Sequence, residues 1–237
     1  MRAWIVGRQV TGAASLKVRA ERLVGDEVDS VEARGKHLLI RFAGGLTLHT
    51  HMRMTGSWHV YRTGAKWQKP KHLARVVLEF GDRVAVCFSA PVIELLPTKT
   101  EWAHPVLAGL GPDILKPPVN IEEVRRRAAE QPPDVPIGDL LLDQQVVAGI
   151  GNIWRNETLF NCGVHPGAAH TDVDIEELVR TASRLMHAHA RLGVVYRPRV
   201  YNRAGRPCPR CQARIESARM GRHARTAYWC PRCQPLL

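Results

Sequence analysis

The pattern of apolar and polar positions changes near the middle of the chain. Between residues 36 and 96, short apolar runs alternate with turn signals: KHLLIRF, a Gly-Gly turn, LTLHTHM, then ARVVLEF, a Gly-Asp turn, and RVAVCF. Short runs of this composition, separated by glycine-containing turns, predict antiparallel hairpins. Repeated hairpins favour a β-sandwich or barrel for the first part of the chain.

A helical pattern begins after HPVLAGLGPDILKPP, a segment rich in glycine and proline. Asn120 can cap a helix over NIEEVRRRAAEQ, and a second, short helix is expected over residues 139–147. Residues 171–192 carry apolar side chains at helical spacing, and Thr171 and Asp174 are expected to open this helix as a capping box. The stripe is more typical of a core than of a site.

The stretch LLLDQQVVAGIGNIWRNETLF predicts a tight turn between two helices. Gly149 and Gly151 permit the turn, and Asn152 stands where it can cap the second helix. Free N–H groups at a helix start, beside a side-chain amide, can hold a phosphate. Glycines that only allow two helices to pack closely are the alternative, although the basic segment farther along the chain favours the phosphate.

Charge narrows the choice of partner. The 237 residues contain 34 Lys and Arg against 22 Asp and Glu, which gives a formal net charge of +12 and a sequence pI near 10.0. Such an excess favours a nucleic acid over a merely solubilising surface. No apolar run approaches the roughly twenty residues that span a bilayer, and the first residues, MRAWIVGRQ, hold too short an apolar core for a signal peptide. We therefore expect a cytoplasmic protein with no membrane partner.

The cysteines predict a metal centre. Cys208 and Cys211, then Cys230 and Cys233, form two Cys-Pro-Arg-Cys pairs, a spacing typical of four thiolates around one structural zinc ion. An iron site or a disulfide framework is the weaker alternative in a reducing compartment. Between the pairs, RIESAR, Met-Gly-Arg and HARTAYW read as strand, turn and strand, a ribbon too short to fold without its metal.

Taken together, these motifs resemble the formamidopyrimidine-DNA glycosylase and endonuclease VIII family of base-excision repair enzymes. The resemblance runs through ARGKHLL, HTHMRMTGSW, HPVLAGLGPDIL, LLDQQVVAGIGNIWRNETLF with GVHP, and the hairpin ending RTAYWCPRCQ. It implies an α+β fold with an N-terminal β-sandwich catalytic domain over residues 1–112, a helix-two-turn-helix DNA-binding domain over 113–200 and a zinc-ribbon finger over 201–237. DNA would bind in the cleft between the halves.

The resemblance also implies roles for individual residues. Lys36 matches the family's active-site lysine, which supports strand cleavage, and a solvated lysine at a strand edge is the alternative. Met54, with Arg53 beside it, matches the residue that fills the gap left by an extruded nucleotide, a task that suits a flexible apolar side chain. Asn152 and Arg225 match the residues that grip the phosphates beside the lesion, and Arg225 is counted with Lys36 among the catalytic residues.

The lesion class follows from the segment after VCFS. The family's oxidised-purine branch carries arginine and phenylalanine there, whereas this chain has Ala90, Pro91, Val92 and Ile93. SAPVIELL resembles the endonuclease VIII branch, which implies oxidised pyrimidines. The implied chemistry is base extrusion, attack of a neutral amine on C1′ of the deoxyribose, and elimination of the flanking phosphates.

The start of the chain departs from the family pattern. Members begin with a proline nucleophile followed by a glutamate, whereas this sequence begins Met1-Arg2-Ala3. A start site placed too late, a truncated product and a non-catalytic binder are the three interpretations. We expect the chain as written to bind damaged DNA without excising a base, and Lys36 to form at most a faint adduct at an abasic site.

The leading hypothesis is a zinc-containing DNA glycosylase and abasic-site lyase that acts as a monomer on duplex DNA with damaged bases or abasic sites, close to the nucleoid. A non-catalytic protein that binds damaged DNA is the rival hypothesis. An RNA- or ribosome-associated zinc ribbon would explain the charge and the cysteines but not GKHLL or AGIGN.

Overall fold

The computed structural model of the chain describes residues 1–192, 196–222 and 224–236. The chain divides into two compact units, Met1–Ala108 and Gly109–Leu237, and each has an apolar core of its own. The first unit holds the sheets, and the second holds the longer helices and the cysteine hairpin. The domain limits expected at residues 112/113 and 200/201 remain predictions.

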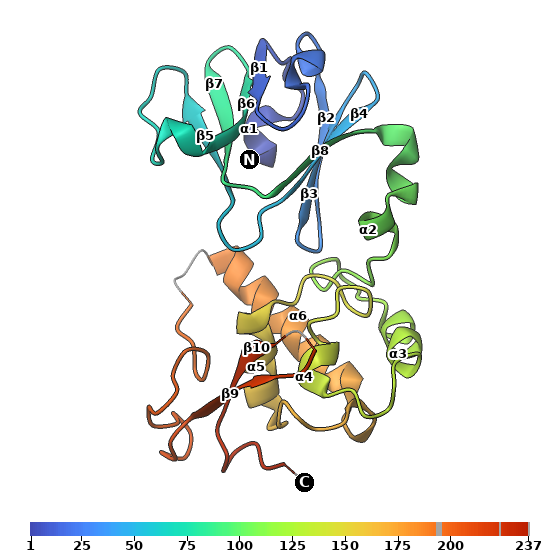
Figure 1. Cartoon of the computed structure of the whole chain (residues 1–237), viewed down its shortest axis with the longest axis vertical. Coiled ribbons are helices and arrows are strands. Elements are labelled where there is room, and N and C mark those ends of the chain that lie inside the picture. Colours follow the sequence, from blue (N-terminus) through green and yellow to red (C-terminus); the bar gives the residue numbers. More distant parts are fainter. Residues whose placement is uncertain (193–195, 223, 237) are drawn as a thin grey trace. The chain divides into compact units, whose positions relative to one another are not determined.

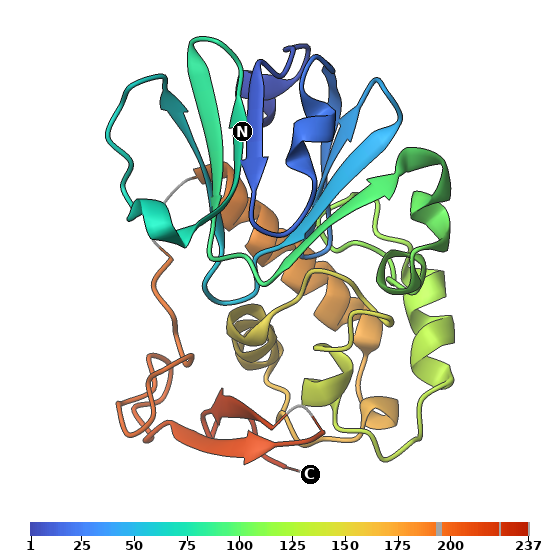
Figure 2. The same cartoon turned by 45° about the horizontal axis from the view of Figure 1, so that its top comes forward.

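Two antiparallel sheets of four strands form the first unit (Figure 1, Figure 2). The strands are β1 Gly12–Ser15, β2 Val28–Arg34, β3 His37–Phe42, β4 Leu46–His51, β5 Ser57–Arg62, β6 Ala74–Glu79, β7 Arg83–Phe88 and β8 Val92–Pro97. One sheet has the order β1-β6-β7-β5 and the other β2-β3-β4-β8. Ile40 and Leu48 from one sheet share a core with Leu78 and Cys87 from the other. The predicted sandwich is confirmed, and the four apolar runs are β3, β4, β6 and β7.

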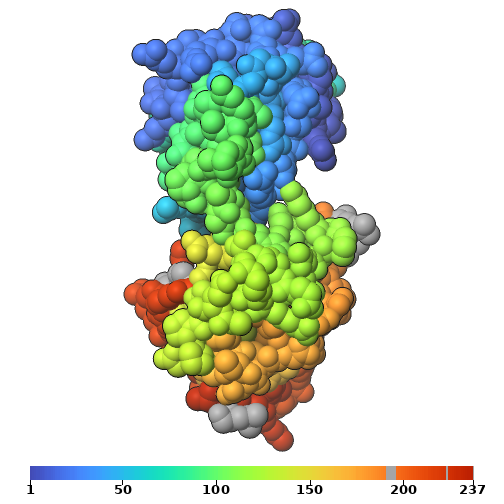
Figure 3. Space-filling view, turned by 90° about the vertical axis from the view of Figure 1, so that its right-hand side faces the viewer, coloured from blue at the N-terminus to red at the C-terminus, as the bar shows by residue number. Residues whose placement is uncertain are grey.

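Short helical segments complete this unit: α1 Arg2–Ile5, η1 Ala20–Leu23, η2 Lys71–Leu73, η3 Thr98–Ala103 and α2 Pro105–Ala108. The green segment of η3 and α2 lies against the blue strands in Figure 3.

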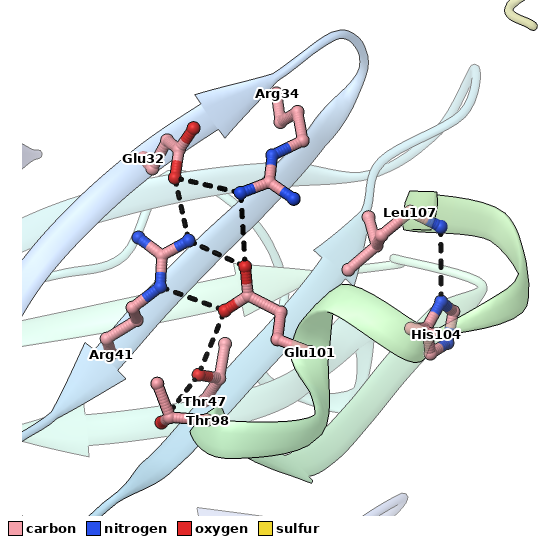
Figure 4. Close-up of polar contacts among 8 residues, drawn as sticks. All are labelled: Glu32, Arg34, Arg41, Thr47, Thr98, Glu101, His104 and Leu107. Atoms are coloured by element: carbon pink, nitrogen blue, oxygen red, sulfur yellow. Dashed lines mark hydrogen bonds and ion pairs between the residues drawn. The ribbon is translucent and has the colours of Figure 1, made fainter. Parts of the chain in front are cut away.

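A buried carboxylate fastens η3 to the sandwich. Glu101 accepts hydrogen bonds from Arg41 at 2.9 and 2.7 Å and from Arg34 at 3.2 Å (Figure 4). Although burial opposes ionisation, the Arg41 guanidinium lowers the pKa of Glu101 below its usual value. These two-point ion pairs fix the end of η3, and so the place of His104, which follows it.

Helices pack around the core of the second unit. They are α3 Ile121–Ala129, α4 Ile137–Leu140, α5 Asn152–Cys162, η4 His170–Asp172 and α6 Ile175–Leu192, followed by the hairpin strands β9 Glu216–Met220 and β10 Arg225–Trp229. Val124, Leu159 and Val179 bring α3, α5 and α6 into one apolar cluster. The predicted cap of α3 is confirmed, because the Asn120 side chain accepts a hydrogen bond from the Glu123 N–H at 3.0 Å.

The helix expected over residues 139–147 is wrong in its bounds. The helical segment there is α4, which ends at Leu140. The Asp143 carboxylate accepts from the Gln145 N–H at 2.9 Å, and the Gln144 side chain bonds to the backbone of Leu142, Gly149 and Ile150. Side-chain contacts of this kind satisfy the backbone in a turn and compete with a helix.

The capping box expected at Thr171 is also wrong. Thr171 lies in η4, and its hydroxyl contacts the neighbouring Asp172. α6 begins at Ile175 because the Asp174 carboxylate accepts from the N–H groups of Glu176 and Glu177, at 2.9 and 3.2 Å. Asp174 is therefore the cap itself and not the third residue of a box.

In the described parts of the chain, we find no helix that is both long and apolar enough to cross a bilayer.

Candidate metal centre and nucleic-acid interface

Four thiols converge at the base of the hairpin. The Sγ atoms of Cys208 and Cys233 are 3.9 Å apart, those of Cys211 and Cys230 are 3.4 Å apart, and all four lie within 4.8 Å of one another. Four sulfurs bound to zinc at about 2.3 Å in a tetrahedron are roughly 3.8 Å apart, whereas a disulfide requires about 2.05 Å. The spacing fits a four-thiolate zinc centre and excludes a disulfide within this group.

The pKa values of Cys211, Cys230 and Cys233 also fit a zinc centre. The backbone N–H of Ala213 lowers the pKa of the Cys211 thiol to about 7, which favours the thiolate that binds metal. Burial and the neighbouring thiols raise the pKa of Cys230, and they raise that of Cys233 to about 12. A divalent cation removes the repulsion between the thiolates, so the site fits zinc in charge as well as in spacing.

The side chains of Asn152, Arg155 and Asn156 hold the hairpin against the start of α5. Asn156, which is fully buried, accepts from the Tyr228 N–H at 2.7 Å and donates to the Asn152 carbonyl at 2.6 Å. Arg155 donates to the Thr226 carbonyl at 2.9 Å, and burial lowers its pKa to about 10. Because the ribbon has only two strands, one edge of β10 lies open, and these side chains satisfy its backbone groups there.

The expected cap by Asn152 is wrong, and the actual contact is more informative. α5 begins at Asn152, its N-cap is Gly151, and no side chain caps it. The Asn152 amide donates instead to the Thr226 carbonyl at 3.1 Å, next to Arg225. The structure thereby brings two predicted phosphate-binding residues together, with the exposed Arg225 at the start of β10 beside the start of α5.

The tip of the hairpin is fixed from α4. The buried Asp139 carboxylate accepts from the Arg222 N–H, and the Arg222 guanidinium pairs with Asp143. A Cβ on Gly221 would lie 2.1 Å from the Asp139 carboxylate oxygens, and φ at this glycine is 65°. Both the space and the backbone conformation therefore require glycine at the turn.

Sequence reasoning missed the buried Glu157. Its carboxylate accepts from the N–H groups of Arg199, Val200 and Tyr201 and from the Tyr196 hydroxyl, and so fixes the chain that leads into the ribbon. At the other end of α5, Arg210 donates to the Phe160 carbonyl at 2.8 Å and lies over its ring. The stretch RNETLF could have indicated a buried polar residue, because four adjacent polar residues in a helix point in different directions and cannot all face solvent.

In the first unit, the structure places Lys36 and the Arg53–Met54 pair at the same end of one sheet. Lys36 lies exposed in the turn between β2 and β3, and His37, which follows it, pairs across the sheet with His51 at the end of β4. Arg53 has φ of 45° and donates its backbone N–H to the His51 ring at 3.0 Å. The next side chain, Met54, is 81% exposed, and its role in filling the gap in a duplex stays a prediction.

Neutral imidazoles line this end of the sheet. Burial, followed by the charges of His51 and His49, lowers the pKa of His37 to about 4. Burial, followed by the charges of Arg53 and Lys36, also lowers the pKa of His51. Both rings are therefore uncharged at neutral pH, and the positive charge at the surface comes from Lys36 and Arg53.

Three family models match successive parts of the chain. The formamidopyrimidine-DNA glycosylase N-terminal domain matches residues 2–91, and the formamidopyrimidine-DNA glycosylase H2TH domain matches residues 110–192. A zinc finger found in FPG and IleRS matches residues 205–236. The three-part α+β fold and the structural zinc site expected from the sequence are confirmed.

Relatives match along most of their length. A probable endonuclease 8 2 of Streptomyces coelicolor is 39% identical over 225 residues, which cover 90% of this chain and 80% of the relative. An endonuclease 8 of Escherichia coli is 35% identical, with 92% of this chain and 88% of the relative covered.

A solved structure shows the same fold. The Lactococcus lactis formamidopyrimidine-DNA glycosylase, non-covalently bound to DNA containing an abasic site, superimposes with a TM-score of 0.85 at 22% identity, over 99% of this chain and 95% of that chain. From the zinc hairpin to the sandwich, fold and sequence agree, and the chain belongs to the formamidopyrimidine-DNA glycosylase and endonuclease VIII family.

Proposed function

We propose that this protein is a base-excision repair enzyme of the endonuclease VIII type, a DNA glycosylase and abasic-site lyase acting on duplex DNA with oxidised pyrimidines. The observation that carries the proposal is the hydrogen bond from the Asn152 amide to the Thr226 carbonyl, which joins the start of α5 to the backbone next to the exposed Arg225. The relatives named endonuclease 8 support the activity, and their name favours the pyrimidine branch.

This arrangement suits a DNA phosphate for three reasons. The first N–H groups of α5 have no acceptor within the helix, and they carry the positive end of its dipole. Arg225 offers a planar fork of donors that matches phosphate oxygens. Arg155, buried below, remains protonated at neutral pH because its lowered pKa is still about 10. We infer that Asn152, Arg225 and the start of α5 hold the phosphate backbone beside the lesion.

The residues of the first unit would act on the extruded nucleotide. Met54 is exposed and flexible enough to enter the space that the nucleotide leaves, with Arg53 beside it. The Lys36 amine, once neutral, can attack the aldehyde carbon of an opened abasic sugar, release water and form an imine. Loss of the C2′ proton then breaks the bond to the 3′ oxygen, and the phosphate leaves with the electron pair.

Borohydride trapping on an abasic-site duplex tests the chemistry. We expect the reduced adduct to be lost in Lys36→Ala and retained in Lys17→Ala, because Lys17 is an exposed lysine in the connection after β1. The binding constant for a duplex with a tetrahydrofuran analogue is measured on the same variants. Tight binding without any adduct would reject the lyase and support the non-catalytic binder, whereas equal binding to damaged and undamaged duplexes would reject both.

We also propose that the protein acts as a monomer in the cytoplasm, associated with the chromosomal DNA. Sedimentation equilibrium at micromolar concentration should give the 26.5 kDa mass of one chain.

A further inference from the structure

A second group of metal-binding side chains lies inside the first unit. Among the residues that the structure describes, two sets of three or more His, Cys, Asp or Glu side chains bring their ligand atoms within 4.8 Å of one another. One set is the four cysteines. The other consists of His49 on β4, Glu94 on β8 and His104 at the end of η3.

The two imidazoles of this set converge on one point. His49 Nδ1 lies 2.7 Å and His104 Nε2 lies 3.1 Å from the same oxygen, Oε2 of Glu94. A zinc ion bound at about 2.0–2.2 Å by two imidazoles and a carboxylate needs ligand atoms roughly 3.3 Å apart. The Glu94 oxygen therefore has to move back by only about half an ångström to admit a cation between itself and the rings.

The two imidazole rings are fixed by burial, whereas the Glu94 carboxylate can move, and a metal site requires this combination. The His49 side chain is 1% exposed and that of His104 is 13% exposed, whereas that of Glu94 is 42% exposed. The two rings are held by their surroundings, and the carboxylate can adjust on its solvent side. Solvent on that side can supply a water as a further ligand.

The hydrogen bonds around the rings fit the metal-bound form. His49 Nε2 lies 2.8 Å from His37 Nδ1, so a cation on Nδ1 leaves Nε2–H free to donate to His37. Metal-binding histidines commonly have such a partner, which fixes the orientation of the ring. On His104 the other ring nitrogen faces the Leu107 N–H at 3.4 Å (Figure 4), a long contact that binding gives up at small cost.

The framework holds the three ligands before any cation binds. His49 and Glu94 are direct partners across β4 and β8, so the sheet register sets their separation. His104 follows η3, which Glu101 ties to Arg41 through two hydrogen bonds.

We propose that His49, Glu94 and His104 form a second metal site, which takes a divalent transition-metal ion of the zinc class. Two imidazoles and one carboxylate favour zinc, nickel or copper over calcium or magnesium, which prefer oxygen ligands. An ion at this site has three protein ligands, whereas the ion in the ribbon has four thiolates, so we expect the ion at this site to exchange more readily. When the ion is bound, it links β4, β8 and the start of α2.

Zinc titration of the full-length protein tests the site. Elemental analysis after equilibration with excess zinc and gel filtration should give two zinc ions per chain, and Glu94→Gln should bind the second at least ~10-fold more weakly. Glutamine keeps the size of the side chain and its contacts with the rings, so this variant should fold. His72→Gln, which changes an exposed histidine in η2, is the control and should bind like the wild type.

Cobalt distinguishes the two sites in the same sample. The ribbon site gives the intense charge-transfer absorption of cobalt–thiolate bonds, whereas the proposed site adds a second cobalt ion without raising that absorption. Hydrogen exchange should show slower exchange in β8 and α2 when the second ion binds, and no such change in His49→Gln. One zinc per chain in excess zinc, or a second zinc bound equally well by Glu94→Gln and His49→Gln, would show that the three side chains form only a hydrogen-bonded network.

Discussion

Asn156→Ala tests how the ribbon is held against α5. The native amide is fully buried, accepts from the Tyr228 N–H at 2.7 Å and donates to the Asn152 carbonyl at 2.6 Å. Alanine removes both contacts and leaves the Tyr228 N–H at the open edge of β10 without its acceptor. The Asn152 carbonyl loses less, because it remains the i−4 acceptor within α5.

The magnitude follows from these two losses. A donor left without a partner in a buried position costs about 1–3 kcal/mol, and the missing amide leaves a small cavity that adds roughly 1 kcal/mol. We expect the ribbon to open locally with a free energy lower by about 2–4 kcal/mol. Because 1.4 kcal/mol is about a factor of ten, the Tyr228 amide should exchange with solvent roughly 30- to 1,000-fold faster.

Amide exchange of the zinc-loaded protein, followed by NMR, measures this directly. Asn161→Ala is the matched control, because Asn161 lies on the same helix and its amide donates to the Glu157 carbonyl of that helix at 2.7 Å. Its loss should change the exchange of Tyr228 by less than about tenfold. If Asn156→Ala and Asn161→Ala give the same rate at Tyr228, the Asn156 side chain does not hold the ribbon.

Three further outcomes follow from the site. Cys208→Ser, or removal of zinc by a chelator, should unfold residues 205–236 while hydrogen exchange of the sandwich stays native, because the ribbon has little core beyond its metal. Burial lowers the pKa of His165, so on acidification the unfolded chain binds a proton at this histidine before the folded chain does. The free energy of unfolding of the second unit should therefore fall as the pH drops below about 6.5. Denaturant titrations should show a smaller fall in His165→Asn. Asp139→Ala should loosen the hairpin tip and speed amide exchange at Arg222, since it removes the acceptor of that N–H group.

Local signals in the sequence predicted much of the architecture. The alternating apolar runs predicted β3, β4, β6 and β7, and Asn120 caps α3 by accepting from an N–H group only three residues away. The four-cysteine spacing predicted the zinc centre because ligand spacing and coordination geometry are local constraints.

Local signals in the sequence could not predict the contacts between segments that are far apart along the chain. Asn152 has the composition of a helix cap, yet its amide donates to Thr226, 74 residues away, because the ribbon supplies a carbonyl there. Glu157 likewise gains its partners at Arg199–Tyr201 only when the chain folds back on α5. The convergence of His49 with Glu94 depends on the register of β4 and β8, which no spacing in the sequence specifies.

The salt dependence of DNA binding by Arg225→Ala tests the central claim most directly. Arg219→Ala is the control, because Arg219 pairs with Thr226 and so lies on the opposite face of the same ribbon. On a duplex with an abasic-site analogue, Arg225→Ala should weaken binding and reduce the slope of log K against log salt by roughly one unit, whereas Arg219→Ala keeps the wild-type slope. An unchanged affinity and slope in Arg225→Ala would contradict the account, because the zinc ribbon would then not present this arginine to a phosphate.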